Sequence, residues 1–316
     1  MESKMHRREL LVGGVAVVAL AGCGGAATRA PHAAPRPAPP PRPAPVSGVV
    51  ERGELESESR FDFRDGAWLS LHHILHELGK KADPSQWRAP GIEEIEATRL
   101  DANEAPTWSA AVEAYGVLAT KDPVFDGQLA QLHIALAERG SLPDLGNVAM
   151  PGDLGRHLTA TMPIYRRHWE SRHAQASLQW LSGVRPILNR HEDDMTVDLG
   201  RWLHASWPTE ATRTQLCPYT NWAGAYSTLG PTRLYVGTLD QRNQGASGVE
   251  VLFHEAAHAL IRPVRDAIGA AADAQNKIVR DLWHVVLFVT AGEVVRRRIP
   301  GYQPYGARLG LYDKGP

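Results

Sequence analysis

LFHEAAHAL, residues 252 to 260, carries the chemistry of this chain and decides how its second half is expected to fold. Two histidines stand four positions apart, and a glutamate follows the first. On a helix such a spacing leaves His254 and His258 about 40° apart around the axis, with Glu255 beside them. Catalytic zinc is bound by such imidazoles, with a carboxylate close enough to take a proton from the attacking water. The stretch predicts a zinc site; the alternative is a buried helix that happens to contain two histidines.

The residues before the motif predict a small sheet that leads into this helix. RTQLCPY and RLYVGTL have strand character, and TNWAGAYSTLGP between them contains the Gly, Asn and Pro of a loop. Gly245 and Ser247 favour a helix start before the motif, and Pro263 favours its end. We therefore expect two strands followed by the helix that carries the histidines.

A third metal ligand is expected from KIVRDLWHVVLFVTAGEVVRRRIPG, residues 277 to 301. The segment predicts a largely buried helix, because it is apolar almost all round and basic only at its end. His284 and Glu293 interrupt it, about half a turn out of phase, so only one can face the metal. We expect Glu293, because a carboxylate in apolar surroundings is costly without a strong partner, and Ala291 and Gly292 allow close helix contact. His284 is the alternative.

GVEVLFHEAAHAL followed by LWHVVLFVTAGEVVRR resembles the gluzincin group of zinc metallopeptidases, over roughly residues 210 to 310. The resemblance implies that His254, His258 and Glu293 bind zinc and that Glu255 is the general base. It also implies a mixed sheet whose edge strand holds an extended peptide substrate above the metal helix, with a helical lobe across the cleft. RLYVGTL, residues 233 to 239, would be that edge strand.

One departure from the family concerns the orientation of the ligands. Many gluzincins have an aspartate one turn after the glutamate ligand, where it orients a zinc-bound histidine, and this chain has Arg297 there. A carboxylate with that role would come from elsewhere, such as Glu250 or Asp240.

A donor to the oxyanion of the reaction is expected from the segment after the Glu293 helix. IPGYQPYGARLGLY contains Tyr302 and Tyr305 where the chain could return to the cleft, and we expect Tyr305 in this role. Arg296 is the other candidate; packing or helix capping are the structural alternatives for these residues.

The N-terminal residues predict export and attachment to a membrane. A short basic segment precedes an apolar run, residues 10 to 21, that is shorter than the roughly 20 residues of a spanning helix. LAGC, ending at Cys23, resembles a bacterial lipobox, so residues 1 to 22 would be a signal peptide and Cys23 the lipid attachment site. An ordinary signal peptide is the alternative, and Arg7-Arg8 leaves a twin-arginine route open. The Pro/Ala-rich residues 23 to 47 predict an extended tether.

The fold class expected is α+β and predominantly helical. Residues 48 to 208 predict a helical lobe, with one helix beginning at Asp65-Gly66 and another ending at Gly140. Residues 209 to 316 predict a zincin-like catalytic region with a small mixed sheet, the HExxH helix and the Glu293 helix.

Other residues that could carry chemistry are assigned structural roles. His72 and His76 are also four apart, but no cysteine or carboxylate pattern completes a second metal site, so we interpret them as one face of a helix. Cys217 has no local nucleophile signature, and with Cys23 carrying lipid no intramolecular disulfide is expected.

These features together predict a membrane-tethered, exported zinc metallopeptidase that acts on peptide bonds. A formal net charge of -1 argues against nucleic acid as a partner. The alternatives are a non-catalytic lipoprotein binding module that keeps the zincin fold, and a zinc hydrolase of another amide. The intact Glu255 favours turnover, because a purely structural metal site would not require that carboxylate.

Overall fold

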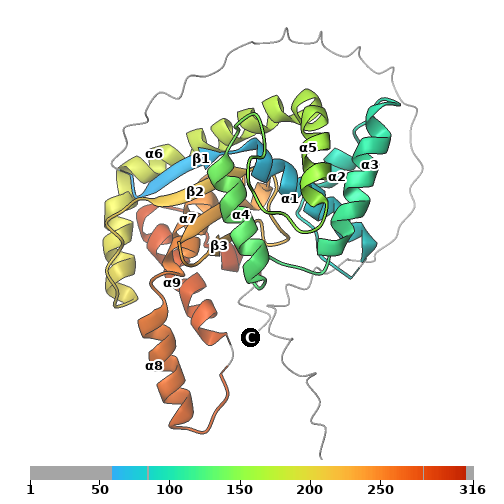
Figure 1. The fold of residues 1–316 in the computed structure, drawn as a ribbon. Coiled ribbons are helices and arrows are strands. Elements are labelled where there is room, and N and C mark those ends of the chain that lie inside the picture. Colours follow the sequence, from blue (N-terminus) through green and yellow to red (C-terminus); the bar gives the residue numbers. More distant parts are fainter. Residues whose placement is uncertain (1–58, 84, 280, 311–316) are drawn as a thin grey trace, which may run out of the picture. The chain divides into compact units, whose positions relative to one another are not determined.

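The computed structural model describes residues 59–83, 85–279 and 281–310 (Figure 1). The expected signal peptide, Cys23 and the tether lie outside the described residues. The strands are β1 (Phe61–Asp65), β2 (Thr212–Cys217), β3 (Ala225–Thr228) and β4 (Arg233–Gly237). The α-helices are α1 (Ala67–Gly79), α2 (Glu93–Glu96), α3 (Glu104–Tyr115), α4 (Gly127–Arg139), α5 (Leu154–Tyr165), α6 (Ser171–Trp202), α7 (Ala246–Ala257), α8 (Arg262–Asp273), α9 (Leu282–Arg298) and α10 (Tyr305–Arg308).

The expected class, α+β with a small mixed sheet in a mainly helical unit, is confirmed. The four strands lie in the order β1-β2-β4-β3, with β1, β2 and β4 parallel and β3 antiparallel to β4. Helices α1 to α6 form the long connection between β1 and β2. The helical lobe and the sheet are therefore joined by a strand pair, with Phe61 opposite Thr212.

Two expectations about the sheet were wrong. RLYVGTL contains β4, which lies inside the sheet between β2 and β3, and is not an edge strand. The edge next to it is β3, which falls within the segment interpreted as a loop. Ala225–Thr228 is too short to show an alternating pattern, and the nearby glycines, Gly224 and Gly230, are typical of loops.

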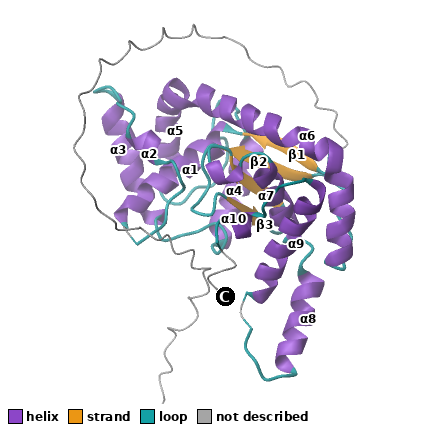
Figure 2. Cartoon of the chain, turned by 180° about the vertical axis from the view of Figure 1, so that it is seen from behind, coloured by secondary structure: helices purple, strands orange, loops and turns teal. Residues whose placement is uncertain are grey.

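The sheet separates two apolar cores, and helices lie on both of its sides (Figure 2). Tyr235 of β4 and Tyr226 of β3 belong to the core built by α1, α3, α4 and α5. Leu234 and Val236 belong to the core built by α6, α7 and α9. Successive residues of β4 thus enter opposite cores, as the alternation of side chains along a strand requires.

Two helix ends in the lobe agree with the sequence. α1 begins at Ala67, directly after Gly66, and α4 ends at Arg139, before Gly140 with a φ of 58°. Asp126 caps α4 by accepting a hydrogen bond from the backbone N–H of Leu129 at 2.9 Å. Glycine suits the position after α4 because its φ lies in the left-handed region.

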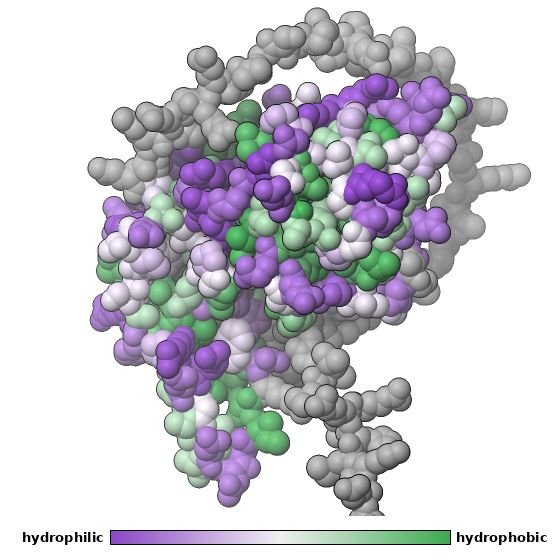
Figure 3. Space-filling model, viewed as in Figure 1, coloured by the Kyte–Doolittle hydropathy of each residue, from purple (hydrophilic) through white to green (hydrophobic). Residues whose placement is uncertain are grey.

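The last helices differ from expectation in their bounds and burial. α7 ends at Ala257, and Pro263 lies in the first turn of α8, where a missing N–H costs no helix bond. α8 runs away from the sheet, and α9 runs back beside α8 toward α7 (Figure 1). The first half of α9 is not buried all round: Val285 is 40% and Val289 46% exposed. Figure 3 shows apolar residues among polar ones on the segment formed by α8 and the first half of α9.

Within the described residues, none of the helices combines the length and the apolar composition needed to cross a bilayer.

Candidate metal centre

The last turn of α7 presents two histidines beside each other. His254 is buried within the helix and His258 is its C-cap residue, with the two ring centroids 4.9 Å apart. Gly248 lets α7 pack closely on α6, because a Cβ there would lie 3.1 Å from the side chains of Trp180 and Val184. The pairing of the two histidines on one face is as predicted.

α9 brings a third imidazole to this pair. His284, in the first turn of α9, places its Nε2 atom 3.3 Å from Nε2 of His254. One ligand atom from each of His254, His258 and His284 lies within 4.8 Å of the other two. In the part of the chain that the structure describes, this is the one group of histidine, cysteine and carboxylate side chains with a geometry that could hold a metal ion. We call it the α7–α9 cluster.

The electrostatics of the α7–α9 cluster favour neutral imidazoles. Burial, and then the neighbouring histidines, hold the pKa of His254 well below its ordinary value. The same causes lower the pKa of His258 to about 3, and burial lowers that of His284. Because a metal binds the unprotonated ring nitrogen, all three side chains are in the ligand form at neutral pH.

The spacing of the nitrogens fits a small tetrahedral ion. Ligands about 2.0–2.1 Å from a tetrahedral zinc lie about 3.3–3.4 Å from one another. The contact between the Nε2 atoms of His254 and His284, at 3.3 Å, matches this edge. Three protein nitrogens with an open fourth position are the ligand set of catalytic rather than structural zinc sites.

The expected third ligand, Glu293, does not belong to the cluster. Arg296 donates two hydrogen bonds to its carboxylate, at 2.6 and 2.7 Å, and Arg297 donates one at 2.9 Å. These two arginines lower the pKa of Glu293 to about 2. The carboxylate therefore has its partners on the next turn of its own helix, and the half-turn offset from His284 keeps it away from α7.

Glu255 lies beside the α7–α9 cluster, as expected of a general base. Its side chain is buried, with one carboxylate oxygen 3.9 Å from Nε2 of His258. The hydroxyl of Ser227, on the edge strand β3, donates a hydrogen bond to this carboxylate. Burial raises the pKa of Glu255 to about 7, against the opposing effect of that hydrogen bond. A cation at the cluster would lower it again, since it favours the charged form.

Tyr302 and Tyr305, which follow α9, contact α7 at Glu250. Tyr302 donates its hydroxyl to Oε2 of Glu250 at 2.6 Å, and the backbone N–H of Tyr305 donates to the same oxygen at 2.8 Å. Burial raises the pKa of the Tyr305 hydroxyl to about 12, and the charges that modify it most are those of Arg242 and Asp240. A role for Tyr305 as an oxyanion donor stays a prediction.

The other expected polar residues have local partners. Asp240 is bound by Arg242 through contacts of 2.6 to 3.0 Å, so it is not free to orient a histidine. Arg296 is engaged by Glu293, and the Arg297 guanidinium also lies 4.4 Å from the ring centroid of Trp202. Cys217 is buried, and burial raises the pKa of its thiol, which does not suit a nucleophile.

Sequence reasoning missed three residues that border the site. Ser227 lies in β3, within the segment TNWAGAYSTLGP that the sequence predicts to be a loop. Trp283 packs on the α7–α9 cluster, with its ring centroid 5.8 Å from that of His258. The ring centroid of Phe288 lies 3.9 Å from that of His254. The signal for these aromatics was present: Trp283 adjoins His284, and Phe288 follows it by one helical turn.

The second group of histidines forms a buried hydrogen-bonded network, which we call the lobe cluster: His72, His73, His76 and His133. Nε2 of His72 lies 3.0 Å from Nε2 of His133. The hydroxyl of Tyr226 lies within hydrogen-bond distance of His73 and His133, and that of Tyr115 is 3.1 Å from Nδ1 of His72. The interpretation of these residues as structural fits these contacts.

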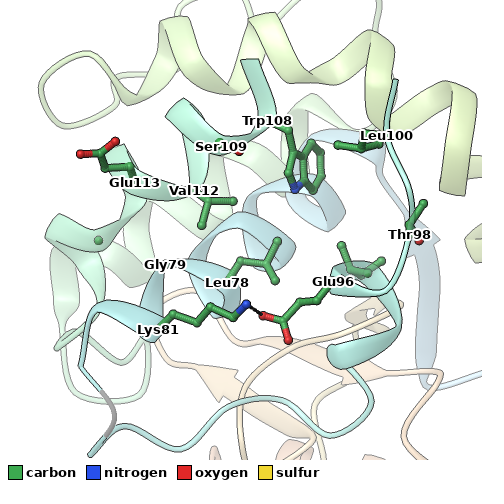
Figure 4. Close-up of a pocket in the computed structure, with 12 residues that line it drawn as sticks. Leu78, Gly79, Lys81, Glu96, Thr98, Leu100, Trp108, Ser109, Val112 and Glu113 are labelled. Atoms are coloured by element: carbon green, nitrogen blue, oxygen red, sulfur yellow. Dashed lines mark ion pairs between the residues drawn. The ribbon is translucent and has the colours of Figure 1, made fainter. Parts of the chain in front are cut away.

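A separate pocket lies in the helical lobe, and none of its lining residues belongs to the α7–α9 cluster (Figure 4). Its apolar wall includes Leu78, Trp108 and Val112, and an ion pair between Lys81 and Glu96 lies on one side.

Comparisons of the chain with models of protein families, with curated proteins and with solved structures found no match.

Proposed function

We propose that the protein is a zinc-dependent metallopeptidase whose metal is held by His254, His258 and His284. The observation that carries this proposal is the convergence of three neutral imidazoles with a carboxylate, Glu255, directly beside them. Three nitrogen ligands favour zinc among the common metals, since calcium and magnesium prefer oxygen.

Within this proposal the residues of the chain have distinct tasks. Zinc, when bound, supplies a Lewis acid that polarises a carbonyl and brings the pKa of water to about 7. Glu255 takes the proton of the attacking water and returns it to the leaving amine. Trp283 and Phe288 exclude bulk water from one side of the three imidazoles, which strengthens the electrostatic contacts there.

A peptide substrate is supported by the position of Glu255 relative to β3. Ser227 of β3 donates a hydrogen bond to Glu255, so the proposed base lies next to the end strand of the sheet. β3 pairs with β4 on one side, and within the described residues no further strand pairs with its other side. An extended peptide can add to such an edge through its backbone groups and bring a carbonyl to the base.

A non-catalytic metal-binding module is the second candidate, and the same contact favours it. A carboxylate that joins α7 to β3 through Ser227 could serve the fold alone. The two functions differ in one result: a catalytic Glu255 is needed for turnover and a bracing Glu255 is not.

Metal content of the purified full chain tests the proposal. Wild type should contain about one zinc per chain, and His258→Ala should lose most of it, because a ligand is removed. Glu293→Gln is the matched control and should retain zinc, because that carboxylate is bound by Arg296 and Arg297. A wild-type chain that cannot be loaded with zinc would contradict the metallopeptidase and the binding module together. A loaded chain that hydrolyses other amides but no peptide in a library would redirect the substrate class.

We also propose that the unit is exported and anchored to a membrane through lipid on Cys23. The support is the lipobox-like LAGC and the apolar run before it. Labelled palmitate should enter the wild-type chain in cells and should not enter a Cys23→Ser chain. Equal labelling of both chains would contradict attachment at this cysteine.

A further inference from the structure

Two buried polar atoms on α7, one helical turn apart, lack a partner among the described residues. They are Nδ1 of His254 and Oε1 of Glu250. Leaving a buried donor or acceptor unpaired destabilises the folded state, and more so when the group is charged. Residues four apart on a helix have neighbouring side chains, so these two atoms can satisfy each other.

The rest of the Glu250 carboxylate is firmly held. Its Oε2 atom accepts hydrogen bonds from the Tyr302 hydroxyl at 2.6 Å and the Tyr305 backbone at 2.8 Å. Oε1 points toward α9 at Gly292, where a Cβ would lie 3.0 Å from it and 2.8 Å from Cβ of Pro304. Glycine at 292 therefore makes room for the second oxygen of Glu250, between the two helices that carry the metal ligands.

The unpaired nitrogen of His254 is the one that a metal would leave free. Its Nε2 faces His284 and belongs to the α7–α9 cluster, while Nδ1 lies on the other side of the ring. An imidazole that binds a metal through Nε2 carries its proton on Nδ1, and that N–H needs an acceptor.

We propose that Glu250 is the positioning residue of the metal centre: its Oε1 accepts the Nδ1 proton of His254, directly or through one water molecule. This inference rests on the proposed metal site. The hydrogen bond keeps Nε2 unprotonated and aimed at the ion. It also connects the ion to the C-terminal segment, because Tyr302 and Tyr305 hold the other oxygen of the same carboxylate. The orienting carboxylate then comes from the metal helix itself and not from the position of Arg297.

Glu250→Gln tests the role with little change of shape. The amide oxygen of Gln is required by Tyr302 and Tyr305, so its NH2 group must face His254. This reverses the polarity at Nδ1 and favours the tautomer protonated on Nε2, which cannot bind the ion. We expect zinc affinity, measured by competition with a chelator on the full chain, to fall about 10–100-fold. Zinc affinity of the Glu250→Ala chain should fall by a factor in the same range.

Tyr302→Phe is the matched control. It removes a hydrogen bond to Oε2 and leaves Oε1 in place, so the melting temperature of the zinc-free chain should fall while zinc affinity stays within about threefold of wild type. A general loosening of the fold would lower both quantities in both variants. Equal losses of affinity in Tyr302→Phe and Glu250→Gln would therefore overturn the positioning role.

A second readout does not need the metal. Long-range ¹H–¹⁵N NMR of the zinc-free wild type at neutral pH should show His254 protonated on Nδ1, and Glu250→Gln should move the proton to Nε2. An unchanged tautomer, or wild-type zinc affinity in both Glu250 variants, overturns this inference and leaves the metallopeptidase standing. Failure of the wild type to bind zinc overturns both.

Discussion

The lobe cluster and the α7–α9 cluster start from the same sequence element, two histidines four residues apart on one helix. In each, an imidazole from another helix approaches, with Nε2 atoms 3.0 Å apart in the lobe and 3.3 Å apart between α7 and α9. In each, burial lowers the pKa values of the histidines. Spacing and burial therefore do not distinguish a metal site from a polar core.

The partners of the ring nitrogens distinguish the two. In the lobe cluster, tyrosine hydroxyls and the backbone oxygen of Leu118 accept or donate at the nitrogens, and the network contains no adjacent carboxylate base. Its one carboxylate neighbour on α1, Glu77, is bound by Lys80 at 2.6 Å. In the α7–α9 cluster the imidazoles face one another, and Glu255 lies 3.9 Å from His258. The two clusters therefore differ in the tyrosine and backbone partners of the lobe histidines and in the carboxylate that lies beside the α7–α9 imidazoles.

The largest effect should come from Glu255→Gln. A general base contributes about 10²–10⁴-fold to a rate, so peptide turnover by the zinc-loaded chain should fall by that factor while zinc content is unchanged. The measurement is kcat on a peptide that wild type cleaves, with Glu293→Gln as the carboxylate control. Turnover within about tenfold of wild type would assign Glu255 the bracing role and not the catalytic one.

His284→Ala and His72→Gln compare the clusters directly. His284→Ala removes a proposed metal ligand. It should weaken zinc binding by more than about 100-fold, the upper end of the loss when a residue that only orients a ligand is changed. His72→Gln should leave zinc affinity unchanged, because the nitrogens of the lobe cluster are occupied by tyrosines and histidines. Chelator competition on both variants decides the matter, and a loss of affinity in His72→Gln would show that the clusters are not independent.

The buried histidines of the lobe cluster should contribute to acid unfolding, as should those of the α7–α9 cluster. Burial lowers the pKa of His73 and His76 to about 3, against an ordinary 6.5. Between these values the unfolded chain binds protons that the folded chain does not, so stability is fully present above pH 6.5 and falls as the pH drops toward 3. Each histidine removes up to about 1.4 kcal/mol per pH unit in that window.

Denaturant unfolding at pH 7 and pH 5 measures this loss. His76→Gln cannot take up a proton, so its stability should change less between the two pH values than that of wild type. His204→Asn, at an exposed histidine with a φ of 53°, is the control and should keep the wild-type difference. A His76→Gln chain with the full wild-type difference would contradict the assignment to this histidine.

The sequence allowed part of the candidate metal centre to be predicted. Helical geometry alone places His254, His258 and Glu255 together, because these residues lie within one and a half turns. The third ligand depends on which face of α9 meets α7, and an apolar helix with two polar residues out of phase does not reveal that face. A local signal against Glu293 was present, since arginines follow it by three and four residues, the spacing of helix ion pairs.

The fold was predictable where structure is local and was missed where it is not. α1 and α4 begin or end at glycines that the sequence displays. β1 pairs with β2 across the whole helical lobe, so its partner is not given by local sequence, and β3 has only four residues, too few for a clear alternating pattern. Pro263 was interpreted as a helix end, although proline is equally suited to the first turn of the next helix.

The smallest effects should come from two neighbours on β3, whose side chains lie on opposite faces of the sheet. Tyr226→Phe leaves nitrogens of the lobe cluster without their hydroxyl, and should lower the free energy of unfolding by about 1–3 kcal/mol with zinc affinity unchanged.

Ser227→Ala removes the hydrogen bond to Glu255, worth about 0.5–1.5 kcal/mol, so turnover should change by no more than about tenfold while stability changes little. Because one strand carries both residues, a general disturbance of β3 would affect both properties in both variants. Urea unfolding and peptide kinetics on the pair separate the two cases. A loss of turnover in Tyr226→Phe that equals that in Ser227→Ala would mean that the polar core of the lobe and the metal centre act as one network.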